Sequence, residues 1–200
     1  VGSSGAADTF VGSTGDDLIL AGAGGDMANA NAGNNVLVGD FGVITLIIGI
    51  VVTVDATEPN EGGQDTLTGT SGNDVILGGP DNDTINGGDG RNILLGDRGS
   101  VTLPSGNVVR IATTTSLSSG NDGITGGTGE DYILGGQGND TISGGGGSDV
   151  IAADLGVITF ANNLVAALDA TTGGTPGTDA ITVGAGAAVA VGGLGNDTFT

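Results

Sequence analysis

Large hydrophobic residues recur at nine-residue intervals through several blocks of the chain, and stretches rich in glycine separate them. One apolar side chain in a run of three or four residues, followed by glycines, is typical of a very short β-strand that ends in a tight turn. We expect one side chain of each such strand to point into the protein interior. The expected interior residues are Phe10, Ile19, Leu37, Leu67, Ile76, Ile85, Leu94, Ile124, Ile133, Ile142, Ile151, Ile181 and Phe199, with Ala28 as a weak member.

The repeating unit has the form G-G-x-G-x-D-x-(aliphatic)-x. Clear copies span 126–134, 135–143 and 192–200, and a copy with one glycine replaced spans 69–77. Blocks of four such nonads alternate with a 21-residue element of another kind, and the whole pattern has a 57-residue period. A fixed period of this length predicts a stacked repeat protein. We therefore expect one continuous solenoid segment of a longer array, with units at approximately 3–59, 60–116 and 117–173 and a partial unit at 174–200.

Two nonads make an 18-residue coil with two short strands, and such coils stack about 4.8 Å apart as parallel sheets. The sequence therefore predicts an all-β protein, a parallel β-roll or β-solenoid. The 21-residue element, for example 43–54 with a turn at Gly49, fits a third coil with longer strands. We expect about three coils per 57-residue unit, or roughly 14 Å of rise. The alternative is a hairpin that protrudes from a two-coil roll.

Composition and charge show that this roll needs a further source of stability. The chain has 44 glycines and few aromatic residues, so it cannot build a conventional hydrophobic core. Its acidic residues number 23, against three arginines and no lysine or histidine, which gives a net charge of −20. Two carboxylates about 6 Å apart repel each other by roughly 1–3 kcal/mol. A divalent cation between them would reverse the sign of this interaction.

The acidic residues form ranks with identical spacing, and these ranks are the candidate metal ligands. Calcium takes six to eight oxygen ligands from carboxylates and main-chain carbonyls, and glycine-rich turns expose carbonyls. If the turns of successive 18-residue coils overlie each other, Asp8 pairs with Asp26, Asp65 with Asp83, Asp122 with Asp140, Asp179 with Asp197, Asp17 with Asn35, Asp74 with Asn92 and Asp131 with Asp149. Asparagine removes a charge, so its sites should be weaker. The further rank Asp40, Asp97 and Asp154 consists either of turn-forming residues or of additional calcium ligands.

These nonads resemble the RTX calcium-binding nonapeptide repeats of secreted bacterial proteins. The resemblance implies a parallel β-roll that folds on binding several Ca²⁺ ions, with the paired residues above and the carbonyls of the turn glycines as ligands. It also implies type I secretion, an extracellular or cell-surface location, and a parent protein such as a toxin, protease, lipase, surface-layer protein or giant adhesin. In the last partial unit, Ala187, Ala188 and Val189 stand where earlier units carry aspartate, which predicts that one site is missing there.

The composition argues against several other functions. Without a basic patch we expect no nucleic-acid partner, and the most apolar run, 43–54, is too short for membrane insertion. The chain lacks His, Cys and Lys, and its aspartates recur in turns, so we expect no enzymatic activity. The prediction is a calcium-binding structural segment of a stalk, fibre or matrix protein, such as an adhesin or filament, whose partners are calcium and further repeats or neighbouring copies. The alternative is an RTX secretion and folding module of a secreted hydrolase or toxin whose catalytic domain lies elsewhere.

Overall fold

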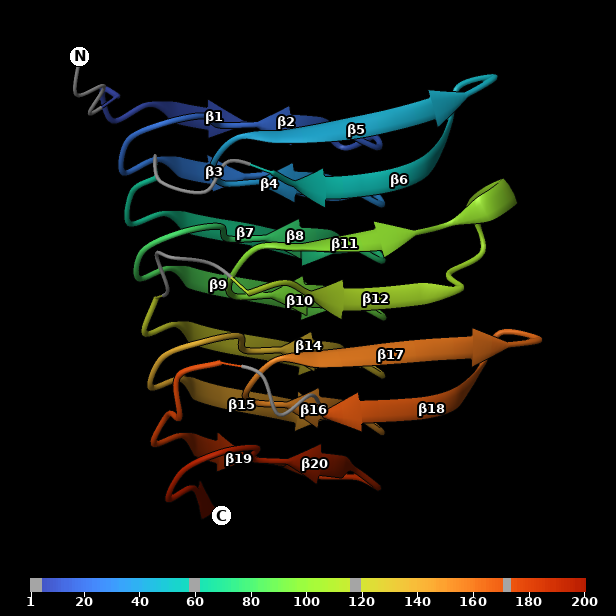
Figure 1. Ribbon diagram of the computed structural model, residues 1–200. Helices are drawn as coiled ribbons and strands as arrows, with labels where there is room; N and C mark the ends of the chain where they lie inside the picture. Colours follow the sequence, from blue (N-terminus) through green and yellow to red (C-terminus); the bar gives the residue numbers. More distant parts are fainter. Residues whose placement is uncertain (1–4, 58–61, 116–119, 171–173) are drawn as a thin grey trace.

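The computed structural model describes residues 5–57, 62–115, 120–170 and 174–200. The chain winds into a stack of coils, and each complete coil contributes one strand to each of two parallel sheets (Figure 1). Sheet A consists of β1 (Thr9–Val11), β3 (Met27–Asn29), β7 (Thr66–Ser71), β9 (Thr84–Asp89), β13 (Gly123–Thr128), β15 (Thr141–Gly146), β19 (Ala180–Thr182) and β21 (Thr198–Phe199). Sheet B consists of β2 (Leu18–Leu20), β4 (Val36–Val38), β8 (Val75–Leu77), β10 (Ile93–Leu95), β14 (Tyr132–Leu134), β16 (Val150–Ala152) and β20 (Val189–Val191). The predicted all-β parallel roll is confirmed.

The middle residue of each three-residue strand points into the space between sheets A and B, as does the second residue of the six-residue strands β7, β9, β13 and β15. In sheet B, for example, Leu94 pairs with Ile76 on one side and with Ile133 on the other, and all three are fully buried. The expected interior rank therefore forms the core between the two sheets. Phe199 is the exception, because it lies in register with Ile181 but is 51% exposed in the last coil of the stack.

The 21-residue elements are antiparallel hairpins, so the expected third coil is wrong. The hairpins are β5 (Gly42–Ile47) with β6 (Ile50–Ala56), β11 (Gly99–Thr102) with β12 (Arg110–Thr113), and β17 (Gly156–Ala161) with β18 (Leu164–Ala170). The second hairpin carries a 3₁₀ turn, Pro104–Gly106. Successive hairpins also pair with each other, β6 with β11 and β12 with β17, which produces a six-stranded antiparallel sheet C.

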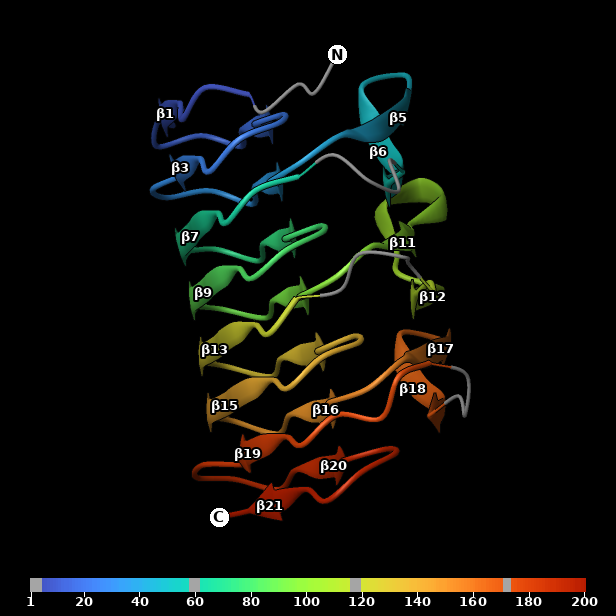
Figure 2. The same cartoon turned by 60° about the vertical axis from the view of Figure 1, so that its left-hand side comes forward.

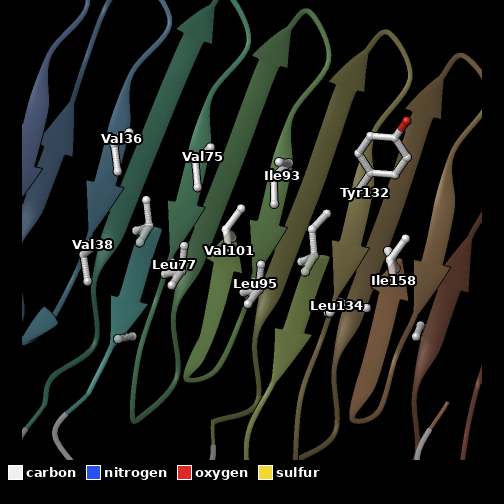
Figure 3. Close-up of a cluster of buried hydrophobic side chains, with 14 of the residues drawn as sticks. Val36, Val38, Val75, Leu77, Ile93, Leu95, Val101, Tyr132, Leu134 and Ile158 are labelled. Carbon is white, nitrogen blue, oxygen red and sulfur yellow. The ribbon is translucent and has the colours of Figure 1, made fainter. Parts of the chain in front are cut away.

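Sheet C covers the outer face of sheet B, so the molecule has three layers in the order A, B, C (Figure 2). The strands of sheet B are apolar on both faces: Val36 and Val38 flank the inward Leu37, and both are buried under sheet C. Figure 3 shows these outward side chains in two rows beneath the hairpins. In the same layer, the rings of Tyr132 and Phe160 meet edge to face at 5.0 Å.

This second core explains why the 21-residue elements do not form coils. As coils they would leave the outer apolar face of sheet B in water, whereas as hairpins they bury it. The strands of sheet A differ, because their outer residues, such as Thr66, Thr84 and Thr141, are polar and exposed. The roll therefore rises by two coils, or roughly 10 Å, from one hairpin to the next, rather than by the expected 14 Å. Among the described residues, no helix is long and apolar enough to cross a membrane.

Candidate functional site: two carboxylate ladders

The turns place the candidate ligands along two opposite edges of the roll. The turns that enter sheet A carry Asp8, Asp26, Asp65, Asp83, Asp122, Asp140, Asp179 and Asp197, which we name the sheet A ladder. The turns that enter sheet B carry Asp17, Asn35, Asp74, Asn92, Asp131 and Asp149, the sheet B ladder. The structure brings together residues 18 apart, as expected, and also residues 39 apart across each hairpin, such as Asp26 and Asp65. Each edge is therefore one continuous ladder rather than a set of separate pairs.

Main-chain amides connect the rungs of each ladder. The amide of Asp83 donates to Oδ1 of Asp122 at 2.8 Å, and the amide of Asp122 donates to Oδ1 of Asp140 at 2.9 Å. The same bond joins every neighbouring pair in both ladders, with distances between 2.7 and 3.1 Å. One oxygen of each side chain beyond the first rung therefore holds the register of the coils, which leaves the second oxygen available for another role.

The second carboxylate oxygens are buried and have no hydrogen-bond partner. They belong to Asp26, Asp65, Asp74, Asp83, Asp122, Asp131, Asp140, Asp149 and Asp179. These side chains are almost completely buried. Leaving a carboxylate buried and unpaired costs several kcal/mol, so native proteins pair such groups or coordinate metals with them. The ladders thus require a positive partner that the side chains of the described residues do not supply.

Glycines keep space open beside these oxygens. A Cβ on Gly126 would stand 2.5 Å from Oδ2 of Asp131 and still closer to the carbonyl oxygen of Gly144 in the next coil. A Cβ on Gly69 would likewise collide with Oδ2 of Asp74 and lie 2.6 Å from the carbonyl oxygen of Gly87. Only glycine leaves this gap between a carboxylate and a carbonyl of the adjacent coil.

The donor set in these gaps fits calcium. All of the facing atoms are oxygens, carboxylate and carbonyl, which are the ligands of a hard cation. Among the described residues, no group of three or more acidic side chains converges closely enough to hold a metal by itself. A site must therefore combine carboxylates with main-chain carbonyls, as the glycine-lined gaps do.

Comparison with family models agrees with this geometry. Residues 3–37, 61–103, 118–156 and 173–200 match four copies of the RTX calcium-binding nonapeptide repeat. The chain belongs to the RTX calcium-binding nonapeptide repeat family. The matched blocks contain every residue of both ladders, whereas the β5–β6 hairpin lies outside them. A search of curated proteins found no match. RTX repeats are structural and calcium-binding, which agrees with the ladders described above.

Burial raises the pKa of the RTX carboxyl groups. The pKa of Asp122 rises to about 9, first because the group is buried and then because Asp140 is close. Burial also raises the pKa of Asp65 to about 7, of Asp131 to about 6 and of Asp140 to about 8. The amide bonds to Oδ1 lower these pKa values but do not outweigh burial. Without a cation, the folded roll therefore binds protons near neutral pH that an unfolded chain would release.

Asparagine changes the RTX site in a defined way. Oδ1 of Asn92 accepts the amide of Asp74 at 3.0 Å, as an aspartate would. Its Nδ2 then faces the oxygens, and it donates to the carbonyls of Gly90 at 3.4 Å and Gly126 at 3.5 Å. Asparagine thus preserves the ladder but places a donor where aspartate has a free oxygen.

Among the described residues, the sheet B ladder ends at Asp149. The amide of Asp131 donates to Asp149, but Ala188 stands where the next rung would be, and it has no side-chain oxygen. Val189 still pairs with Val150, so the strand continues without the ligand. This geometry is consistent with the expected missing site.

Asp40, Asp97 and Asp154 lie at the branch point where each hairpin leaves the roll, beside the sheet A ladder, and all three are buried. Asp97 accepts the amides of Gln137, at 2.5 Å, and Gly120, at 3.1 Å, and Asp154 accepts the amide of Leu194. The hydrogen bonds to Gln137 and Leu194 join residues 40 apart, so they are not the local bonds of a turn-forming aspartate. Each ties the base of a hairpin to the following coil.

Proposed function

We propose that this chain is a calcium-stapled architectural segment, in which Ca²⁺ ions between the coils replace the protons of the buried carboxylates. The observation that carries the proposal is the unbroken run of buried, unpartnered oxygens along the sheet A ladder, with glycine-lined gaps beside them. The ligands would be the side chains of both ladders and carbonyl oxygens of the turn glycines. Sites that include Asn35 or Asn92 would be weaker than sites built from aspartates alone, because they lose a charge and an oxygen.

The continuity of the three sheets supports a length-extending role. Sheets A and B pass each hairpin without interruption, and sheet C joins neighbouring units through β6–β11 and β12–β17. A unit that binds its neighbours through three sheets forms a rod that grows linearly with the number of repeats. We infer a stalk, fibre or matrix element of a large secreted or cell-surface bacterial protein, such as an adhesin or filament, exported by a type I pathway.

The 57-residue units are part of this proposal. The hairpins begin at Gly42, Gly99 and Gly156, so their starts are evenly spaced by one such unit. The boundaries expected at residues 3, 59–60, 116–117 and 173 lie outside the described residues. Each unit would comprise two coils and one hairpin.

Small-angle X-ray scattering of chains with two, four and six units tests the architectural role. In calcium the maximum dimension should increase by roughly 10 Å per unit, and in chelator the chains should scatter as expanded coils. A maximum dimension in calcium that does not grow linearly would refute the rod. The competing role, a secretion and folding module of a hydrolase or toxin, would be favoured by a catalytic domain in the same parent chain.

A further inference from the structure

Asp40 differs from Asp97 and Asp154, although the three occupy the same place in successive units. Asp97 and Asp154 each accept a main-chain amide from the coil that follows, donated by Gln137 and Leu194 respectively. These amides neutralise part of the buried charge without any ion.

In the first unit that donor is missing. Pro80 stands at the position of Gln137 and Leu194, and proline has no amide hydrogen. Gly63, at the position of Gly120, is near enough to lower the pKa of Asp40 but makes no hydrogen bond of normal geometry to it. Both oxygens of Asp40 are consequently buried without a partner, in a side chain that is 1% exposed.

Other oxygens surround the Asp40 carboxylate. Its Oδ2 lies 2.6 Å, and the carbonyl oxygen of Pro80 2.9 Å, from the point where a Cβ of Gly62 would stand. The unpartnered Oδ2 of Asp65 and the carbonyl oxygen of Gly78 lie close to the Cβ position of Gly39, the residue next to Asp40.

The nearby charges are negative as well. Burial raises the pKa of Asp40 to about 9, and the charges of Asp65, Asp81 and Asp26 add to this rise. An uncompensated carboxylate in such surroundings is strongly destabilising, whereas a hard cation would find carboxylate and carbonyl oxygens nearby.

We propose that Asp40 belongs to an additional calcium site, outside the nonapeptide pattern, at the branch point of the first hairpin. Asp65 and the carbonyl oxygens of Gly78 and Pro80 complete the oxygen set around it. This inference rests on the proposed calcium-binding function. The other two branch points use an amide instead, so this site is specific to the unit that carries Pro80.

Calcium stoichiometry, measured by isothermal titration calorimetry on the whole chain, tests the site. Asp40→Asn should bind one ion fewer than the unsubstituted chain and keep its β-sheet circular dichroism in calcium. The matched control, Asp97→Asn, removes a charge at the equivalent branch point and should leave the number of ions unchanged. Equal stoichiometry for the two variants would overturn the proposal.

A second variant keeps the test decisive if Asp40→Asn does not fold. Pro80→Gln installs the amide that Gln137 provides in the next unit, and it leaves every ligand side chain in place. The amide should compete with the ion for Asp40, so one site should be lost or weakened at least tenfold while the roll stays folded. Unchanged binding by Pro80→Gln would contradict the site. If the unsubstituted chain binds no calcium at all, the proposed function fails rather than this inference alone.

Discussion

Asp122→Asn should stabilise the roll without calcium and lose about half of that advantage in calcium. Asn keeps the Oδ1 that accepts the amide of Asp83, as Asn92 does for Asp74 in the other ladder. It replaces the unpartnered Oδ2 by an amide group. The substitution therefore separates the ligand role of this side chain from its role in holding the coil register.

The two opposing effects have comparable size. Without calcium, burial raises the pKa of Asp122 from 3.8 to about 9. Protonating this group in the folded state at about pH 7.5 then costs on the order of 5 kcal/mol, a cost that Asn avoids. With free calcium at about one hundred times the Kd of the site, losing the site removes about 2.7 kcal/mol of stabilisation.

Urea unfolding, followed by circular dichroism, measures both effects. In chelator, with an osmolyte such as TMAO to bring both chains into the transition range, Asp122→Asn should unfold at higher urea than the unsubstituted chain. In calcium at about one hundred times the Kd, this difference in stability should shrink by about 2.7 kcal/mol, roughly half of its value. Asp169→Asn changes the same charge at an exposed position on β18 and should do neither. If Asp122→Asn destabilises the chain equally in both conditions, the carboxylate is a structural group and not a ligand.

Three further outcomes follow from the same geometry. Burial raises the pKa values of ladder carboxyls to between about 6 and 9. The calcium-free roll should therefore be most stable below pH 3.8, and it should lose that stability as the pH rises through these raised pKa values. Circular dichroism in chelator should show β-structure on acidification and none at about pH 8. Gly126→Ala puts a Cβ into the gap beside Asp131 and should lower calcium stoichiometry, whereas Gly146→Ala, which meets no atom within 4 Å, should not. Ile111→Ala opens a cavity under sheet C and should cost roughly 2–5 kcal/mol in calcium-saturated urea unfolding, whereas Ile48→Ala, at a residue that is 97% exposed, should leave the midpoint unchanged.

The two-sheet roll could be predicted because its information is local. Each strand carries one obligatory inward residue, such as Ile76 or Ile133, and each turn carries glycines and an acid at fixed offsets. The nine-residue period is enough to determine which residues face inward and which turns overlie each other. The candidate ligands followed from the same spacing, because a stacked coil brings equivalent residues together whatever the rest of the chain does.

The third sheet was not predicted, because the evidence for it appears only when the strands of alternate nonads are compared with each other. Strands of sheet B are apolar at all three positions, as in Val75–Leu77, whereas strands of sheet A flank one apolar residue with polar ones, as in Thr84–Asn86. That difference indicates that sheet B is covered on its outer face, and the 21-residue hairpins are the elements available to cover it. The hydrogen bonds of Asp97 at the branch point join residues 23 and 40 apart and could not follow from the nonad period alone.

Far-UV circular dichroism during a calcium titration tests the central claim most directly. The chain in EGTA at about pH 7.5 should give a disordered spectrum, because its buried carboxylates cannot be satisfied without protons or cations. Calcium should convert this spectrum to that of β-sheet, magnesium at the same concentration should not, and added EGTA should reverse the change. A β-sheet spectrum that persists unchanged in EGTA would contradict the account, because the carboxylate ladders would then not need an ion to fold.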